Sequence, residues 1–302
     1  MPEKILITIV GPTAVGKTAL SIKLAETLKT EIVSADSRQF YREMDIGTAK
    51  PSSEELRKVN HHFINSLSIQ NDYSVGDYEK DALTCLENLL KKHDKVILVG
   101  GSGLFVKAIC EGLDTLPSGN KQIREHYEIL FREKGLQSLQ TELKEKDLAY
   151  FETVDKQNPR RLIRALEVIS QTGKPYSDFR KRKPSQRNFS AIKIGLNLDK
   201  ELLRKRIDQR IDDMLAAGWL DECKKLYPSR NLNALKTLGY SELFDFIEGK
   251  SDWDTIVNTI KINTWHYAKR QLTWFRKDKE IKWFLPGEED EIIKYLVLSS
   301  KI

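Results

Sequence analysis

Hydrophobic positions alternate between two patterns along the first hundred residues. Ile5–Val10 is a continuous apolar run rich in β-branched residues, which predicts a strand buried on both faces. A glycine-containing turn follows, and helical spacing then predicts a helix over Lys17–Lys29. Further strands are predicted at Glu31–Ala35 and Val96–Val99, with a helix at about Val75–Lys92 between them. This alternation predicts a parallel sheet with helices on both faces.

The pattern changes in the middle of the chain. From Leu116 to Arg187 the spacing is helical and polar, and few strand patterns occur. Ile192–Leu198 then predicts a strand that returns to the sheet, and Glu201–Phe284 is again mostly helical. The sequence therefore predicts an α/β core formed by residues 1–115 and 188–302, with an all-helical insertion at 116–187.

Composition limits the class of protein. The 302 residues are 40% hydrophobic and 31% charged, which is typical of a folded globular chain and not of a disordered one. No apolar run approaches the roughly 20 residues of a membrane-spanning helix, and the start of the chain shows no signal-peptide cleavage pattern. The three cysteines are far apart, so we expect neither a zinc site nor a disulfide framework. We expect a cytoplasmic monomer.

Positive charge is concentrated in one segment. The formal net charge of the chain is +6, whereas residues 156–187 hold ten Lys or Arg and two acidic residues, a local balance of +8. Such a segment is either a solvated basic surface or a nucleic-acid-binding surface, and the charge alone does not decide between them. The ten basic residues are Lys156, Arg160, Arg161, Arg164, Lys174, Arg180, Lys181, Arg182, Lys183 and Arg187.

A phosphate-binding motif joins the first strand to the first helix. It fits Gly-x4-Gly-Lys-Ser/Thr in the required strand–turn–helix context, which predicts a P-loop NTPase-like core. Its backbone N–H groups and the following helix N-terminus suit an anion, Lys17 can reach a terminal phosphate, and Thr18 can bind Mg²⁺. The motif comprises Gly11, Pro12, Thr13, Ala14, Val15, Gly16, Lys17 and Thr18.

The chemistry at this loop is not that of an ordinary ATPase. A conventional P-loop ATPase has an acidic residue at the end of a buried strand. Here the predicted strand Val96–Val99 is followed by Gly-Gly-Ser-Gly, which contains no acidic residue. Pyrophosphate binding for another purpose is the alternative. Asp36 follows the second predicted strand and should lie near the loop, because strand ends converge on the ligand crevice. It is either a proton acceptor or a turn residue.

Several stretches together resemble the tRNA dimethylallyltransferase family. They follow the order of the family's motifs and span most of the chain. In Gly100-Gly101-Ser102 this chain has serine where threonine is common, which keeps the hydroxyl. The stretches are Gly-Pro-Thr-Ala-Val-Gly-Lys-Thr (11–18), Asp-Ser-Arg-Gln-Phe-Tyr (36–41), Met-Asp-Ile-Gly-Thr-Ala-Lys-Pro (44–51), His61-His62, Val-Gly-Gly-Ser-Gly-Leu (99–104), Asn-Pro-Arg-Arg-Leu-Ile-Arg-Ala-Leu-Glu-Val (158–168), Leu-Gly-Tyr (238–240) and Ala-Lys-Arg-Gln-Leu-Thr-Trp-Phe-Arg (268–276).

The resemblance implies an activity. Members of the family transfer a dimethylallyl group from dimethylallyl pyrophosphate to N6 of adenosine 37 in tRNAs that read codons starting with U. It implies that Asp36 is the general base, that Thr18 positions the pyrophosphate or its Mg²⁺, and that the loop holds the leaving pyrophosphate or a nucleotide such as ATP. One of Arg206 and Arg210, which are four residues apart, would meet the pyrophosphate. The alternative for either arginine is a salt bridge to Asp208, Asp212 or Asp213.

The resemblance also implies a set of tRNA contacts. Arg160 and Arg164 lie one helical turn apart and would contact phosphates. The aromatic residues near the C-terminus, Trp265 to Phe275, form either an RNA surface or part of the core. The implied contact residues are Asp36, Ser37, Arg38, Gln39, Ser102, Arg124, Arg160, Arg161, Leu162, Ile163, Arg164, Thr237, Leu238, Gly239, Tyr240, Ser241 and Glu242.

Three other functions compete with this interpretation. An adenylate isopentenyltransferase shares the loop and the aspartate but prenylates a free nucleotide, and the basic helical insertion argues against it. A nucleoside or shikimate-type kinase would transfer phosphate from ATP, and leaves the C-terminal half unexplained. A non-catalytic RNA-binding protein would bind tRNA without forming product.

Overall fold

The computed structural model describes residues 4–180 and 185–299, and these residues form two compact units. The first unit combines Met1–Glu111 with Gln186–Ile302, and the second is Gly112–Ser185. The chain therefore leaves the first unit once and returns to it. The predicted boundaries of the insertion were 116 and 187. The basic residues Lys181, Arg182 and Lys183 of the predicted charged segment lie outside the described residues.

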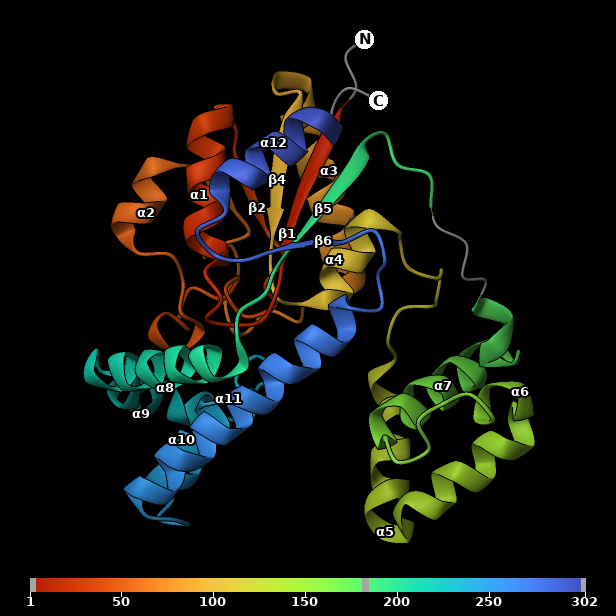
Figure 1. Ribbon diagram of the computed structural model, residues 1–302. Coiled ribbons are helices and arrows are strands. Elements are labelled where there is room, and N and C mark those ends of the chain that lie inside the picture. Colours follow the sequence, from red (N-terminus) through yellow and green to blue (C-terminus); the bar gives the residue numbers. More distant parts are fainter. Residues whose placement is uncertain (1–3, 181–184, 300–302) are drawn as a thin grey trace. The chain divides into compact units, whose positions relative to one another are not determined.

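A single parallel sheet of six strands is the centre of the first unit (Figure 1). Its strand order is β3-β2-β4-β1-β5-β6, so the strand that precedes the phosphate-binding motif lies inside the sheet. The predicted parallel α/β core is thereby confirmed. The strands are β1 (Ile5–Val10), β2 (Ile32–Ser34), β3 (His61–His62), β4 (Lys95–Val99), β5 (Ser190–Leu196) and β6 (Lys282–Phe284).

Helices cover both faces of the sheet. Successive side chains of a strand point to opposite faces, so a strand that is apolar throughout needs a packed layer on each side. Ile7 and Ile9 of β1 belong to a core shared with α1, α8 and α12, whereas Leu6 and Val10 belong to a second core shared with α3 and α4. The helices are α1 (Lys17–Leu28), α2 (Ser53–Lys58), α3 (Val75–Lys92), α4 (Gly103–Cys110), α8 (Lys200–Ala216), α9 (Trp219–Leu226), α10 (Tyr240–Ile247), α11 (Trp253–Phe275) and α12 (Glu289–Ser299), with short 3₁₀ turns η1 (Ile46–Thr48) and η3 (Tyr227–Ser229).

The second unit is helical, as the insertion was predicted to be. Its elements pack around their own apolar core, which includes Leu139 and Leu143 of α5 and Leu162 and Leu166 of α7. Gly135 interrupts α5 with a φ of 73°. The elements are α5 (Lys121–Lys146), α6 (Leu148–Phe151), α7 (Pro159–Thr172) and the 3₁₀ turn η2 (Tyr176–Phe179).

Two short edge strands complete the sheet. The segment up to about Phe284 was predicted to be mostly helical, and it is, except at its end, where Lys282–Phe284 forms β6 beside β5. At the other edge, the adjacent histidines of β3 have separate partners, since His61 Nδ1 lies 2.8 Å from Val59 O and His62 Nε2 lies 2.8 Å from Glu31 Oε2. A three-residue strand gives too short a pattern to be recognised from sequence.

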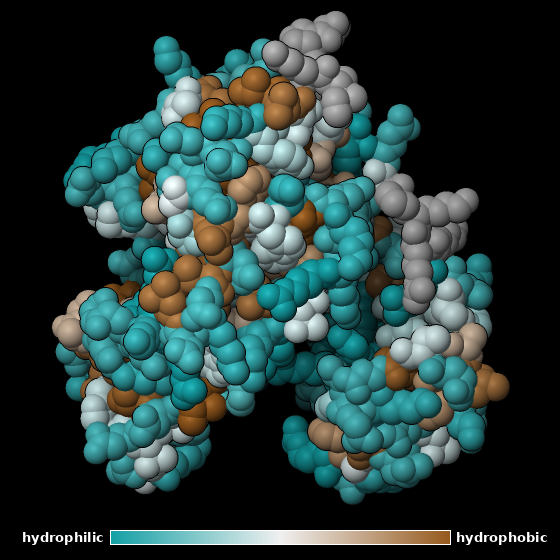
Figure 2. Space-filling view, viewed as in Figure 1, coloured by the Kyte–Doolittle hydropathy of each residue, from teal (hydrophilic) through white to brown (hydrophobic). Residues whose placement is uncertain are grey.

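Most of the visible surface is polar. Figure 2 shows hydrophilic residues over most of the face in view, with hydrophobic residues in small groups. Within residues 4–180 and 185–299, no helix combines the length and the apolar character needed to cross a bilayer.

Candidate active site

The phosphate-binding motif adopts the backbone path that its glycines predict. Gly11 has a φ of 146° and Gly16 a φ of 107°, values that residues with a Cβ rarely adopt. A Cβ on Gly11 would also lie 2.5 Å from the carbonyl oxygen of Leu196. Gly16 is the N-cap of α1 and offers no side-chain hydrogen bond, so the first N–H groups of the helix are available to an anion.

Lys17 is held inside the loop. Its Nζ donates hydrogen bonds to the carbonyl oxygens of Gly11 at 3.0 Å and Pro12 at 2.7 Å. Burial, and next the nearby Arg210, lower the pKa of Lys17 to about 7, although Asp36 opposes the shift. The lysine is therefore poised to gain a proton when a phosphate arrives.

Asp36 lies beyond the end of β2 and close to Lys17 of the loop, as predicted. Its Oδ1 accepts a hydrogen bond of 2.9 Å from the backbone N–H of Arg38, so the residue also stabilises its own turn. Both roles considered for this residue are compatible with its position.

The two arginines of α8 occupy different places. Burial lowers the pKa of Arg210, against the opposing influence of Asp36, which marks the two as neighbours. Arg210 donates to Ala49 O at 3.3 Å and Arg206 to Val15 O at 3.4 Å. In the described part of the chain, neither arginine forms the salt bridge considered as an alternative, and Asp212 pairs instead with Lys261 at 2.7 Å.

A cavity of about 420 Å³ joins these groups, and we call it the main cavity. Its volume is within the usual range for a small-ligand site. A second hollow, the phosphate groove, borders the same loop and is lined by both Arg206 and Arg210. Arg210 lines both spaces, whereas Arg206 lines only the groove. Residues of the main cavity that carry charge near the loop are Lys17, Asp36 and Arg210.

The two ends of the main cavity differ in chemistry. Its enclosed end is apolar, because Ile207, Ile211, Trp219 and Tyr240 are each at most 3% exposed. Its open end is basic. The mouth is lined by Arg38, which is partly exposed, and by Lys236 and Arg270, which are exposed. An apolar group therefore fits the interior, and a polyanion fits the mouth.

Gln271 of α11 is a site residue that sequence reasoning missed. Its Oε1 accepts from Thr13 N at 2.8 Å and its Nε2 donates to Gly101 O at 2.9 Å, so one side chain ties the phosphate-binding loop to the loop after β4. A Cβ on Gly101 would lie 2.3 Å from Nε2. The motif around residue 271 was noticed, but nothing in it singled out the glutamine.

The residues after Asp36 form a connected turn. Ser37 N donates to Ser102 Oγ at 3.1 Å, and Arg38 donates to the carbonyl oxygen of Ala234 at 3.1 Å. Gln39 Nε2 donates to Thr48 O and Ala49 O, both at 3.3 Å. The predicted contacts on both sides of the mouth, 36–39 and 237–238, therefore lie around one cavity.

The predicted contact at Tyr240 needs correction. Its side chain is fully buried, and its hydroxyl donates to Glu222 Oε1 at 2.6 Å, so it belongs to the wall of the cavity and not to the outer surface. Glu242 also has internal partners, since it accepts from Gly239 N at 2.7 Å and Asn263 Nδ2 at 2.8 Å. Ser241 is exposed and its hydroxyl donates to Thr237 O.

The predicted arginine surface of the second unit divides into two groups. Arg160 and Arg161 are exposed on α7. Arg124 and Arg164 instead each approach the buried carboxylate of Glu167 at 3.1 Å, where two cations neutralise one buried acid. Leu162 and Ile163 were predicted contacts, but both are buried in the core of this unit, which corrects the prediction for their side chains.

The donor set near the loop fits Mg²⁺ in one respect. The described residues contain no group of three His, Cys, Asp or Glu side chains able to hold a metal. Mg²⁺ does not require such a group, because it keeps several waters and takes its other ligands from one or two side chains and substrate phosphates. Thr18, which lines both spaces, could supply a hydroxyl.

Known proteins are similar to this chain in sequence and in fold. A curated tRNA dimethylallyltransferase from Christiangramia forsetii is 53% identical over 98% of each chain, and one from Cytophaga hutchinsonii is 47% identical over 97% of each chain. A crystal structure of a full-length tRNA isopentenylpyrophosphate transferase from Bacillus halodurans matches with a TM-score of 0.73 and 35% identity, over 99% of this chain and 97% of that one. That crystal structure has the P-loop NTPase-like fold that the sequence predicted for this chain.

The structure of a eukaryotic protein is also similar to this chain. Crystal structures of a eukaryotic dimethylallyltransferase acting on tRNA match with a TM-score of 0.74 and 26% identity, over 90% of this chain and 70% of that one. The family model described as IPP transferase matches residues 39–278, most of the chain. The chain therefore belongs to the IPP transferase family.

Proposed function

We propose that the protein transfers a dimethylallyl group from dimethylallyl pyrophosphate to N6 of adenosine 37 in tRNAs that read codons starting with U. The observation that carries the proposal is the main cavity. One space brings together a phosphate-binding loop, a carboxylate, an enclosed apolar end and a basic mouth. Each part corresponds to one part of the two substrates: pyrophosphate, amine, prenyl chain and RNA.

The donor's pyrophosphate would lie against the loop. The N–H groups at the start of α1, together with Lys17 and Arg210, offer positive charge to the oxygen atoms on which charge accumulates as pyrophosphate leaves. Thr18, together with pyrophosphate oxygens and water, would hold Mg²⁺, which supplies further neutralisation of the leaving group. Because pyrophosphate departs intact, the site has no need of a hydrolytic acid at the end of β4.

The acceptor would enter through the mouth. A base inside a stacked anticodon loop is out of reach of the cavity, so adenosine 37 must turn outward. Its N6 forms the new bond to C1 of the donor as the bond from C1 to the pyrophosphate oxygen breaks, and Asp36 accepts the proton that nitrogen loses. Proton acceptance matters here because the lone pair of an aromatic amine is delocalised and weakly nucleophilic.

The acceptor can be tested directly. We expect the purified protein, given dimethylallyl pyrophosphate and Mg²⁺, to add one dimethylallyl group to an unmodified anticodon stem-loop that carries adenosine 37. AMP in the same mixture should stay unmodified, and a stem-loop with guanosine at position 37 is the matched control. Prenylation of AMP alone would instead assign the protein to the adenylate isopentenyltransferases.

Donor binding should take up a proton at Lys17. The free lysine, with a pKa near 7, is mostly neutral at pH 8, and a bound pyrophosphate raises its pKa again. We expect uptake of about one proton at pH 8 and almost none at pH 6, because below pH 7 the lysine is already charged. Calorimetric titration in buffers of different ionisation enthalpy measures this uptake.

The control for Lys17 keeps the charge and removes the titration. Lys17→Arg should bind the donor at pH 8 without proton uptake, because arginine stays protonated. The same uptake by wild type and Lys17→Arg would show that another group takes up the proton.

Exposed arginines on α7 should contact tRNA phosphates. We expect Arg161→Ala to weaken tRNA binding and to lower the slope of log affinity against log salt by roughly 0.7–0.9, the value for one phosphate contact. Arg132→Ala, another exposed arginine of the same unit that no motif includes, is the control. An unchanged slope in Arg161→Ala would remove that residue from the interface.

The proposal carries three further expectations. Because its substrate is tRNA, we expect the protein in the cytoplasm, and because one chain carries the groups that the proposed reaction uses, we expect a monomer. ATP should compete with the donor, because its phosphates can occupy the same loop.

A further inference from the structure

Trp219, Gly47 and Tyr240 form a rigid floor at the enclosed end of the main cavity. The limit that this floor sets on the length of the donor's tail rests on the proposed function. Ile207, Ile211 and Met214 line the cavity along one face of α8 and lead away from the loop. Beyond them, Trp219 and Tyr240 line the cavity, 2% and 0% exposed. A group that enters with its pyrophosphate on the loop therefore points its tail toward the indole.

Trp219 is fixed between two glycines. A Cβ on Gly47 would lie 2.0 Å from Trp219 Nε1, and a Cβ on Gly239 would lie 2.1 Å from the six-membered ring. Only residues without a side chain allow the indole to sit there. Tyr240 adds an edge-on contact, with 5.8 Å between ring centroids. On the sides packed by Gly47, Gly239 and Tyr240, the ring has no free space into which it could retreat from the cavity.

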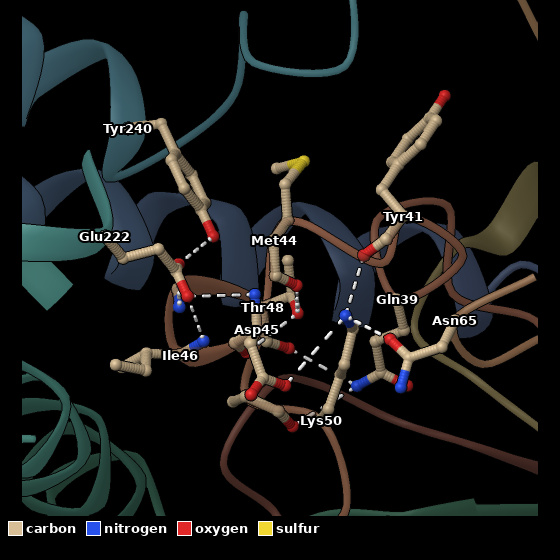
Figure 3. A network of polar contacts seen from close by, with 12 residues as sticks. Gln39, Tyr41, Met44, Asp45, Ile46, Thr48, Lys50, Asn65, Glu222 and Tyr240 are labelled. Atoms are coloured by element: carbon tan, nitrogen blue, oxygen red, sulfur yellow. Dashed lines mark hydrogen bonds and ion pairs between the residues drawn. The ribbon is translucent and has the colours of Figure 1, made fainter. Parts of the chain in front are cut away.

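A hydrogen-bonded clamp holds the first of these glycines in place (Figure 3). Glu222 of α9 accepts hydrogen bonds from three successive backbone N–H groups, those of Asp45 at 3.0 Å, Ile46 at 2.8 Å and Gly47 at 3.1 Å. The same carboxylate accepts the hydroxyl of Tyr240 at 2.6 Å. Gly47 and Tyr240 are therefore hydrogen-bonded to one carboxylate, Trp219 packs against both, and the three residues form one rigid floor.

The same segment is anchored at its other end. Lys50 Nζ donates to Tyr41 O at 2.7 Å and to Asn65 Oδ1 at 2.6 Å, with its side chain almost completely buried (Figure 3). The clamp and this anchor enclose the residues 45–50, so the floor cannot move by a shift of this loop alone.

The floor offers hydrocarbon and no polar partner. The indole Nε1 of Trp219 is buried without a hydrogen-bond partner, and Gly47 covers it. A hydroxyl on the tail of a donor would gain nothing at this surface and would lose its water. The end of the cavity therefore favours a short, unsubstituted alkyl tail.

We propose that Trp219 limits the prenyl donor to a single isoprene unit. In this proposal a dimethylallyl tail ends before the indole, and the second isoprene unit of a geranyl tail would need the space that the indole fills. A packed floor that cannot retreat excludes the longer chain by overlap, which is a stronger discrimination than a difference in buried area.

The test compares two donors on one stem-loop acceptor. For wild type, Trp219→Leu and the control Trp253→Leu, the kcat/KM for geranyl pyrophosphate is divided by that for dimethylallyl pyrophosphate. Trp253 packs on Phe246 of the same unit and does not line the cavity. Because any loss of folded protein lowers both values equally, the ratio reports the cavity alone. We expect Trp219→Leu to raise the ratio at least about tenfold, and Trp253→Leu to leave it at the wild-type value.

Each outcome bears on a separate claim. An unchanged ratio in Trp219→Leu, or a wild type that already uses geranyl pyrophosphate as well as dimethylallyl pyrophosphate, would overturn the floor assignment and leave the proposed function intact. A wild type that uses neither donor would overturn the proposed function. If Trp219→Leu does not turn over, displacement of bound dimethylallyl pyrophosphate by geranyl pyrophosphate measures the ratio of the two affinities instead, and this ratio should also rise relative to wild type. Met214→Ala, which widens the partly exposed wall next to the floor, should raise the ratio in the same direction.

Discussion

Asp36→Asn is expected to lower turnover by about 100-fold or more, because the variant cannot accept the proton from the adenine amine. Asparagine keeps the oxygen that accepts the hydrogen bond from Arg38 N, so the turn after β2 should persist. The affinity for tRNA should stay within about threefold of wild type, since one neutral amide replaces one carboxylate at the mouth. Steady-state kinetics with saturating donor and a separate tRNA-binding titration measure the two quantities.

A comparison of two variants separates chemistry from structure at this position. Asp36→Ala loses both the base and the acceptor for Arg38 N, so any excess of its defect over that of Asp36→Asn measures the contribution of the turn. Turnover in Asp36→Asn close to that of wild type would show that another group, or water, accepts the proton.

Arg210→Ala is expected to reduce kcat/KM for the donor by roughly 30- to 150-fold, which corresponds to the loss of about 2–3 kcal/mol from a charge-assisted hydrogen bond. Arg206→Ala, one helical turn earlier, should lower it by roughly tenfold or less. The reason for the difference is position, because Arg210 lines both the main cavity and the phosphate groove and lies near Lys17 and Asp36, whereas Arg206 lines the groove alone.

The pair of arginines also provides its own control. Both side chains lie on α8 and both donate to a backbone carbonyl, so a general loss of stability should affect the two variants alike. A larger effect in Arg206→Ala would assign the pyrophosphate contact to Arg206. Equal effects would contradict the assignment of this contact to Arg210 alone. The Michaelis constant for tRNA should change little in either variant.

The sequence was sufficient for the parts of the fold that depend on local pattern. The buried strand Ile5–Val10, the helix Val75–Lys92 and the loop between β1 and α1 all carry their signal within a few neighbouring residues, and the structure has them at the predicted positions. The position of Asp36 could also be predicted, because parallel strand ends meet at one edge of a sheet.

Features that depend on contacts between distant segments were out of reach. Gln271 lies 258 positions from Thr13, and only the fold brings them together. The same is true of Trp219, whose surroundings, Gly47 and Gly239, come from distant parts of the chain. A tryptophan near a helix start has no local feature that distinguishes the floor of a cavity from ordinary packing.

The resemblance to the family also led to some buried residues being predicted as tRNA contacts. All residues of a motif were treated as contact residues, although a motif in a helix contains both exposed and buried positions. In α7 the structure separates Arg160 and Arg161, which are exposed, from Leu162 and Ile163, which are buried. Arg164 follows neither group, because it neutralises the buried Glu167. Amphipathic spacing predicts such a division, and the residues' helical positions could have shown it.

The central claim is that this phosphate-binding loop releases pyrophosphate during transfer to carbon and does not transfer phosphate. The most direct test follows the mass of the stem-loop product and the amount of pyrophosphate released, in parallel reactions supplied with dimethylallyl pyrophosphate or with ATP. We predict that the product gains one dimethylallyl group, with one pyrophosphate released for each group, only in the first reaction. A phosphate-sized mass gain with ATP, and none with dimethylallyl pyrophosphate, would contradict the account and favour a kinase.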